Sequence, residues 1–168
     1  ESAARRDPFW GSAADAASAL GSIRSDASRQ ALERLLEVEH PKVRRCVAAA
    51  LAGWADSRSA KVLGSVARKD PSLHVRGEAL RGLGRAKDPA LLAELRAAFK
   101  RPSYWQTVAS AALQGLSLSR DPRVLPDLVR ASKPPTAYPT RAHALRALST
   151  WHQTDPSLID VIAASLTS

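Results

Sequence analysis

The 168-residue chain has no methionine, one cysteine and few aromatic residues. A single cysteine excludes an internal disulfide and indicates a reducing, cytoplasmic compartment. Cys46 lies between Val43 and Val47 on an apolar helix stripe, which favours core packing, although the preceding Arg44 and Arg45 leave a reactive thiol open. The longest unbroken apolar run, 46–54, is too short to cross a bilayer, so no membrane partner is expected.

The motifs of common catalytic and cofactor sites are also missing. The sequence contains no HExxH zinc motif, no Gly-x-Ser-x-Gly elbow, no phosphate loop and no dinucleotide fingerprint. The four histidines, His40, His74, His143 and His152, are spread over separate segments. His40 and His74 could approach each other, but two histidines without carboxylates make a weak metal site. We therefore expect no catalytic residue, no metal and no cofactor in this chain.

What the chain does have is a leucine that recurs at steps of 31, 32, 33 and 32 residues. These leucines are Leu20, Leu51, Leu83, Leu116 and Leu148. Small or β-branched residues precede each one by four and by eight positions. Offsets of 0, 4 and 8 lie on one stripe of a helix, because a turn takes 3.6 residues. The stripe predicts a buried helix face in every repeat.

A second mark has the same period. Aspartates open another apolar run in each repeat, at Asp26, Asp56, Asp88, Asp121 and Asp155. Aspartate is a favoured helix N-cap, and proline follows three of these aspartates at the first helical position. Each repeat is therefore a pair of helices. Pro126 falls inside one expected helix and predicts a kink or a late start, and the glycines at 82 and 84 predict a helix end.

The predicted fold is all-α, a right-handed α-solenoid of about ten antiparallel helices. We expect a half unit at 8–23, helix pairs at 26–54, 57–85, 88–117 and 121–150, and a half unit at 155–168. The pattern is cut in mid-unit at both ends. Together with the missing methionine, this predicts one repeat domain excised from a larger protein. Arginine outnumbers lysine and alanine is abundant, which indicates a GC-rich bacterial gene.

The second helix of each pair resembles a HEAT repeat. Asp70-Pro71, followed by Val75-Arg76, Ala79 and Leu83, matches the HEAT pattern, and Val43-Arg44 and Thr140-Arg141 repeat its central pair. The resemblance implies that the turn aspartate and the helix arginine form a ladder between neighbouring units. Arg44, Arg76 and Arg141 are therefore expected to be structural, and Ala13 and Ala109 to interrupt the ladder.

The opening segment, 7–23, resembles the start of the C-terminal HEAT-like region of aminopeptidase N-like zinc metallopeptidases. Phe9-Trp10-Gly11, the following alanines and Leu20-Gly21 carry the likeness, while Ser12 and Ala13 replace the family's Val-Arg. The resemblance implies a catalytic domain upstream that holds the zinc. It also implies that this chain packs on that domain and limits access to the active site. Phe9 and Trp10 are the candidate contacts.

The formal net charge of +9 is concentrated in the middle of the chain. Residues 42–101 hold 14 Lys and Arg against 5 Asp and Glu, and the remaining residues balance. Arg45, Arg81 and Arg85 are candidates for an interface with an acidic protein partner or domain. A solvated surface is the simpler explanation, and nucleic acid is the less favoured partner. The alternative function is a free-standing HEAT module that binds a protein or nucleic acid through a basic concave face.

Overall fold

The computed structural model describes residues 10–101, 103–151 and 155–164, and all regular structure within these ranges is helical. The α-helices are α2 (Trp10–Ile23), α3 (Asp26–Leu35), α4 (Pro41–Ala52), α5 (Ser57–Lys69), α6 (Leu73–Arg85), α7 (Leu92–Phe99), α8 (Thr107–Leu118), α9 (Leu125–Ala131), α10 (Tyr138–Trp151) and α11 (Leu158–Ala164). Short 3-10 helices, η1 (Pro89–Leu91), η2 (Tyr104–Gln106) and η3 (Pro122–Val124), precede α7, α8 and α9.

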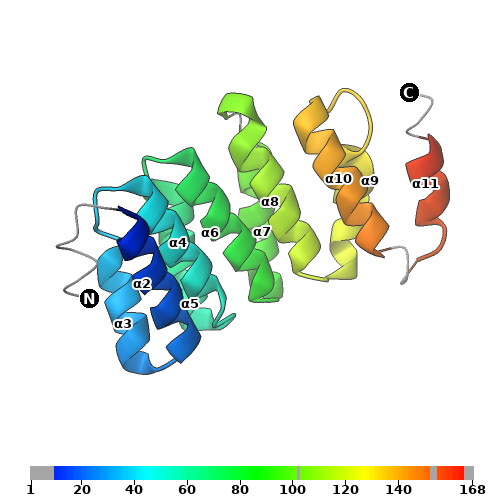
Figure 1. Cartoon of the computed structure of the whole chain (residues 1–168). Helices are drawn as coiled ribbons and strands as arrows, with labels where there is room; N and C mark the ends of the chain where they lie inside the picture. Colours follow the sequence, from blue (N-terminus) through cyan, green and yellow to red (C-terminus); the bar gives the residue numbers. More distant parts are fainter. Residues whose placement is uncertain (1–9, 102, 152–154, 165–168) are drawn as a thin grey trace.

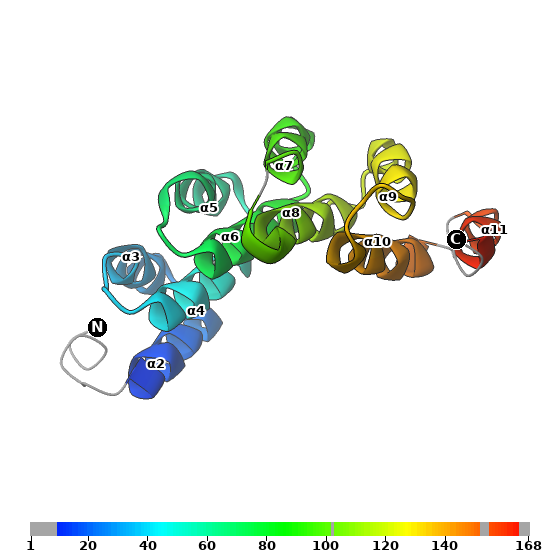
Figure 2. The same cartoon turned by 90° about the horizontal axis from the view of Figure 1, so that it is seen from above.

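The helices form two layers that curve into an arc (Figures 1 and 2). Figure 2 shows α2, α4, α6, α8 and α10 along the concave side, and we call these the inner helices. The outer helices α3, α5, α7 and α9 lie on the convex side, each antiparallel to the inner helix that follows it. This arrangement confirms the predicted α-solenoid of helix pairs.

Polar caps start the outer helices. The side chain of Asp56 accepts a hydrogen bond from the backbone N–H of Ser59 at 2.8 Å, and Asp121 accepts one from Arg123 at 2.9 Å. At α3 the N-cap is Ser25 instead of the predicted Asp26, because Ser25 and Ser28 cap each other's backbone N–H groups. Pro126 lies in the first turn of α9, after η3, so the helix starts late and needs no kink.

Left-handed residues end the inner helices, and none of them is glycine. Arg24, Ala55, Lys87 and Arg120 have φ of 50–54°, and each follows the repeat's leucine by four positions. The prediction that the glycines at 82 and 84 end a helix is wrong, since α6 continues to Arg85. These two glycines lie inside α6, where they permit close packing against neighbouring helices.

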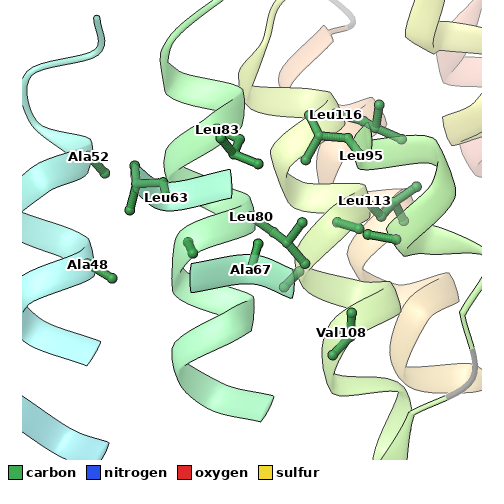
Figure 3. Packing of buried hydrophobic residues seen from close by; sticks show 14 of the residues in the cluster. Ala48, Ala52, Leu63, Ala67, Leu80, Leu83, Leu95, Val108, Leu113 and Leu116 are labelled. Atoms are coloured by element: carbon green, nitrogen blue, oxygen red, sulfur yellow. The ribbon is translucent and has the colours of Figure 1, made fainter. Parts of the chain in front are cut away.

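The leucine stripe forms the core of four repeats. Leu51, Leu83, Leu116 and Leu148 are each at most 1% exposed, and Figure 3 shows Leu83 and Leu116 among side chains from the outer helices. The first repeat differs. In α2 the buried residues are Ala13, Ala14 and Ala17, while Leu20 is half-buried and Ser12 is exposed. Among the described residues no inner helix precedes α2, so the flank that carries Ser12 and Leu20 is not covered there.

This difference gives a test of the linear stack. Leu83→Ala should lower the free energy of unfolding by ~2–5 kcal/mol, because Leu83 is buried between repeats on both sides. Leu20→Ala, the matched control, should cost clearly less and loosen only the first repeat. Denaturant melts of both variants measure the two losses. Equal losses would contradict a stack stabilised by nearest-neighbour contacts.

Candidate interaction surfaces

A row of polar side chains crosses the concave side from α6 to α10. Glu78 pairs with Arg81 at 2.7 Å, and Arg81 donates to the amide oxygen of Gln114 at 3.5 Å. The Gln114 amide nitrogen lies 3.0 Å from Nδ1 of His143. We call Glu78, Arg81, Gln114 and His143 the inner polar row. It joins three consecutive repeats, with Arg81 and Gln114 at one helix position and Glu78 and His143 at another.

The surface around the inner polar row is positively charged. Arg85 lies 3.9 Å from the same Glu78 carboxylate, so a single acid faces two arginines. The pKa of His143 is lowered, first by burial and then by the charges of Arg146 and Arg81, which keeps its imidazole neutral near pH 7. Arg85 and Arg146 are exposed. The concave side therefore presents guanidinium groups that suit carboxylates on a partner.

The predicted interface residues fall in different places. Arg81 and Arg85 lie on the concave side, beside Glu78. Arg45 is exposed on α4 and has no acidic partner among the described residues. Trp10, which begins α2, is 38% exposed, and its ring stacks on His40 with a centroid distance of 5.7 Å. The ammonium group of Lys42 lies 4.1 Å from the centre of the Trp10 ring. Phe9 lies outside the described residues.

Of the three arginines expected in the ladder, Arg44 joins neighbouring repeats. Its guanidinium binds both carboxylate oxygens of Asp70, at 2.7 and 3.0 Å, and also donates to the carbonyls of Val38 and Glu39. The bond to Asp70 raises the pKa of Arg44, which stays charged although the residue is buried.

The other two arginines depart from the ladder expectation. Arg76 donates to the carbonyl of Ala67 in its own repeat, at 2.9 Å, and the sequence from 95 to 120 holds no acidic residue that could take the place of Asp70. Arg141 is half-buried and makes no ion pair within the described part of the chain. Asp70 follows Arg44 by 26 residues, and the sequence around the same distance after Arg141, 161–168, contains no acidic residue.

A second ladder, which the sequence reasoning missed, joins the outer helices. Each step pairs an arginine with an acid about one repeat away, and the pairs are Arg29–Asp56, Arg58–Glu33, Arg68–Glu94 and Arg96–Asp127. Arg29 and Asp56 are 2.7 Å apart, and Arg96 and Asp127 are 2.8 Å apart. The pKa of Asp56 is lowered, first by the Ser59 N–H and then by its bond to Arg29. The four arginines lie at different positions of their helices, so alignment of the outer helices by repeat gives no signal for these pairs.

The ion pairs of the two ladders reduce the positive charge that segment 42–101 can offer to a partner. Several of its arginines are neutralised by acids of adjacent repeats, including Arg44, Arg58, Arg68 and Arg96. The surplus charge in 42–101 is therefore only partly available to a partner. The unneutralised cations lie mainly on the concave side and at the turns between helices.

The described residues offer little for catalysis. None of their His, Cys, Asp and Glu side chains form a group of three or more that could hold a metal ion. A cavity of about 410 Å³ between α5 and α7 is lined by Ser57, Lys61, Asp88 and Glu94, without an activated nucleophile beside a base. Cys46 is a half-buried free thiol. No described helix combines the length and apolarity that a membrane crossing requires.

Comparison with known protein families agrees with this architecture. A family model described as HEAT repeats matches residues 1–73 and again 60–149. No curated protein matches the chain. The matched residues contain the stacked helix pairs, the buried leucine stripe and most of both arginine ladders. The chain belongs to the HEAT-repeat family.

Proposed function

We propose that this chain is a non-catalytic scaffold that binds a protein partner along its concave side. The inner polar row carries the proposal, because it spans three repeats and lies among arginines: Glu78 faces Arg81 and Arg85, and the charge of Arg146 acts on His143. HEAT repeats commonly mediate protein–protein interaction, and a curved stack presents one long surface to a partner. The charge of this surface favours a partner with exposed carboxylates.

The partner we propose is a catalytic domain in the same polypeptide. The likeness of Phe9-Trp10-Gly11 and the following alanines to aminopeptidase N-like zinc metallopeptidases supports this choice. In such a protein the zinc would belong to the catalytic domain, and this solenoid would pack on that domain and limit the access of substrates. Trp10 supports the docking, since it is partly exposed at the first described helix and its ring is held in place by contacts with His40 and Lys42.

The gene tests the identity of the partner. A reading frame upstream of Glu1 that encodes HExxH, with a glutamate about twenty residues later, would support the aminopeptidase assignment. A frame without a zinc motif would overturn it. In that case the alternative stands, a free-standing HEAT module with a separate partner.

Binding tests the surface. The upstream domain, produced separately, should bind the chain in titration calorimetry, and the double variant Arg81→Glu, Arg146→Glu should weaken this binding at least about tenfold. Lys61→Glu, on the outer helix α5, is the matched control and should bind like the unchanged chain. If both variants bind equally well, the concave side is not the interface.

A further inference from the structure

Three large aromatic side chains project from one edge of the solenoid. Tyr104, Trp105 and Tyr138 are 76%, 72% and 74% exposed. The first two lie in η2, before α8, and Tyr138 begins α10, so they come from consecutive repeats whose inner helices start along the same edge, at the top of Figure 1. η2 also contacts α10. Trp151, by contrast, is 2% exposed in the core.

The backbone holds these rings outward. Trp105 and Gln106 both have left-handed backbone angles, with φ of 50° and 57°, which residues other than glycine rarely adopt. The turn is fixed by hydrogen bonds from Gln106 N–H to the Ser103 carbonyl at 3.0 Å and from Val108 N–H to the Ser103 hydroxyl at 3.0 Å. The left-handed turn keeps the rings of Tyr104 and Trp105 exposed. A regular helix start would not need such a turn.

The same edge is positively charged. Lys100, Arg101 and Lys133 are exposed at the turns that carry the aromatic residues. The sequence has no acidic residue from 95 to 120, and none from 128 to 151. We call Lys100, Arg101, Tyr104, Trp105, Lys133 and Tyr138 the aromatic edge. No carboxylate within these two segments competes for its cations.

We propose that the aromatic edge docks an extended, acidic segment of polypeptide. Exposed Trp, Tyr and Arg are the side chains that contribute most to protein interfaces, and aromatic rings on a surface accept proline and aliphatic groups of extended peptides. The lysines and arginine would bind the carboxylates of the segment. The proposal rests on the scaffold function proposed above and extends it with a second surface, at the starts of α8 and α10.

Geometry favours polypeptide over two other occupants. The Tyr104 and Trp105 rings are nearly perpendicular, with an interplanar angle of 82° and centroids 6.0 Å apart, so they cannot stack together on parallel consecutive bases. A membrane surface would require apolar side chains to insert. The exposed aliphatic residues Ile23 and Leu118 end their helices at the opposite edge, and Ile159 lies on α11.

A fluorescence anisotropy titration tests the proposal on the full chain. The probe is a labelled peptide of six Glu-Pro repeats, and the same peptide with glutamine in place of glutamate tests the role of charge. We expect the acidic peptide to bind, with a salt-sensitive affinity, and the glutamine peptide to bind at least about fivefold more weakly. Trp105→Ala, Tyr138→Ala and Lys133→Glu should each weaken binding by a similar factor. All three side chains are exposed, so the variants should fold.

Matched controls lie on the opposite edge. Ile23→Ala and Lys87→Glu change an exposed apolar group and an exposed cation, and both should leave peptide affinity unchanged. The proposal is overturned if the acidic peptide does not bind, or if the control variants lose as much affinity as the edge variants. It is also overturned if an oligo-dT strand or a phosphatidylserine vesicle binds more tightly and depends on Trp105. The two proposals can fail separately. If the double variant Arg81→Glu, Arg146→Glu loses binding to the upstream domain but the acidic peptide does not bind the chain, the proposed function stands and this inference is overturned.

Discussion

Gly84→Ala is expected to lower the free energy of unfolding by ~3 kcal/mol or more, because it forces two inner helices apart. A Cβ atom at Gly84 would overlap the carbonyl oxygen of Gly115 and lie 2.6 Å from its carbonyl carbon and 2.7 Å from its Cα. The obstruction is backbone, so no side chain can move aside. The preference of helices for alanine, about 1 kcal/mol, does not offset the overlap. Denaturant melts with circular dichroism measure the loss.

Gly64→Ala is the matched control for this prediction. Gly64 also lies inside a helix, α5, but a Cβ there would meet only the ends of two side chains, Arg68 at 3.3 Å and Glu94 at 3.5 Å. These groups can move by a few tenths of an ångström. We expect unchanged stability or a gain of up to ~1 kcal/mol. Two alanine variants with the same effect would contradict the close contact between α6 and α8.

Asp70→Ala is expected to cost ~3–5 kcal/mol, because it leaves the buried guanidinium of Arg44 without its carboxylate. The two side chains are only 10% and 8% exposed, and both carboxylate oxygens accept from Arg44. Asp70 also accepts from the backbone N–H of Ser72 at the turn before α6, at 2.8 Å. Urea melts at neutral pH measure the change in the free energy of unfolding.

Two further variants separate the ion pair from other effects at this turn. Glu33→Ala breaks the more exposed pair with Arg58 on the outer layer and should cost less than ~1 kcal/mol. Combining Asp70→Ala with Arg44→Met should recover part of the loss, since the unpaired charge is then gone. If the double variant is no more stable than Asp70→Ala, the buried charge is not the source of the cost.

The helix pairs could be predicted because two independent marks share one period. The leucine stripe located the inner helices and the aspartates located the outer ones, and the observed pair of α5 and α6 begins and ends where the expected pair 57–85 does. The stripe fails at Leu20, where the terminal position decides burial and the local pattern does not. Ser25 replaced Asp26 as a cap because two serines can cap each other, and the pattern alone gave no preference.

The glycines could not be assigned from the sequence. A glycine near the end of an apolar run can terminate a helix or admit a neighbour, and the chain uses Gly84 for the second purpose. The left-handed positions that end the inner helices are instead Arg24, Ala55, Lys87 and Arg120, residues with no sequence signal for that conformation. Only the packing of consecutive repeats distinguishes the two cases.

The candidate surfaces were only partly predictable. Arg81 and Arg85 were identified by the charge of the middle repeats, but the link through Gln114 to His143 requires knowledge of which helix positions face the concave side. The sequence around Tyr104 and Trp105 fits packing between repeats as well as it fits exposure. Their exposure follows from the left-handed turn at η2. The turn contains no glycine, so the sequence gives no signal for this backbone conformation.

Site-directed labelling tests the central claim most directly, that the concave side binds a protein partner. Ala49→Cys, in a Cys46→Ser background, places a single thiol on α4 at the helix position that Arg81, Gln114 and Arg146 occupy in later repeats. Lys61→Cys in the same background places the thiol on the outer helix α5. In a polypeptide that joins the chain to the proposed upstream domain, maleimide should label the first thiol more slowly than in the chain alone, and the second at an unchanged rate. Unchanged labelling of the Ala49→Cys thiol, or protection of only the outer thiol, would contradict the account.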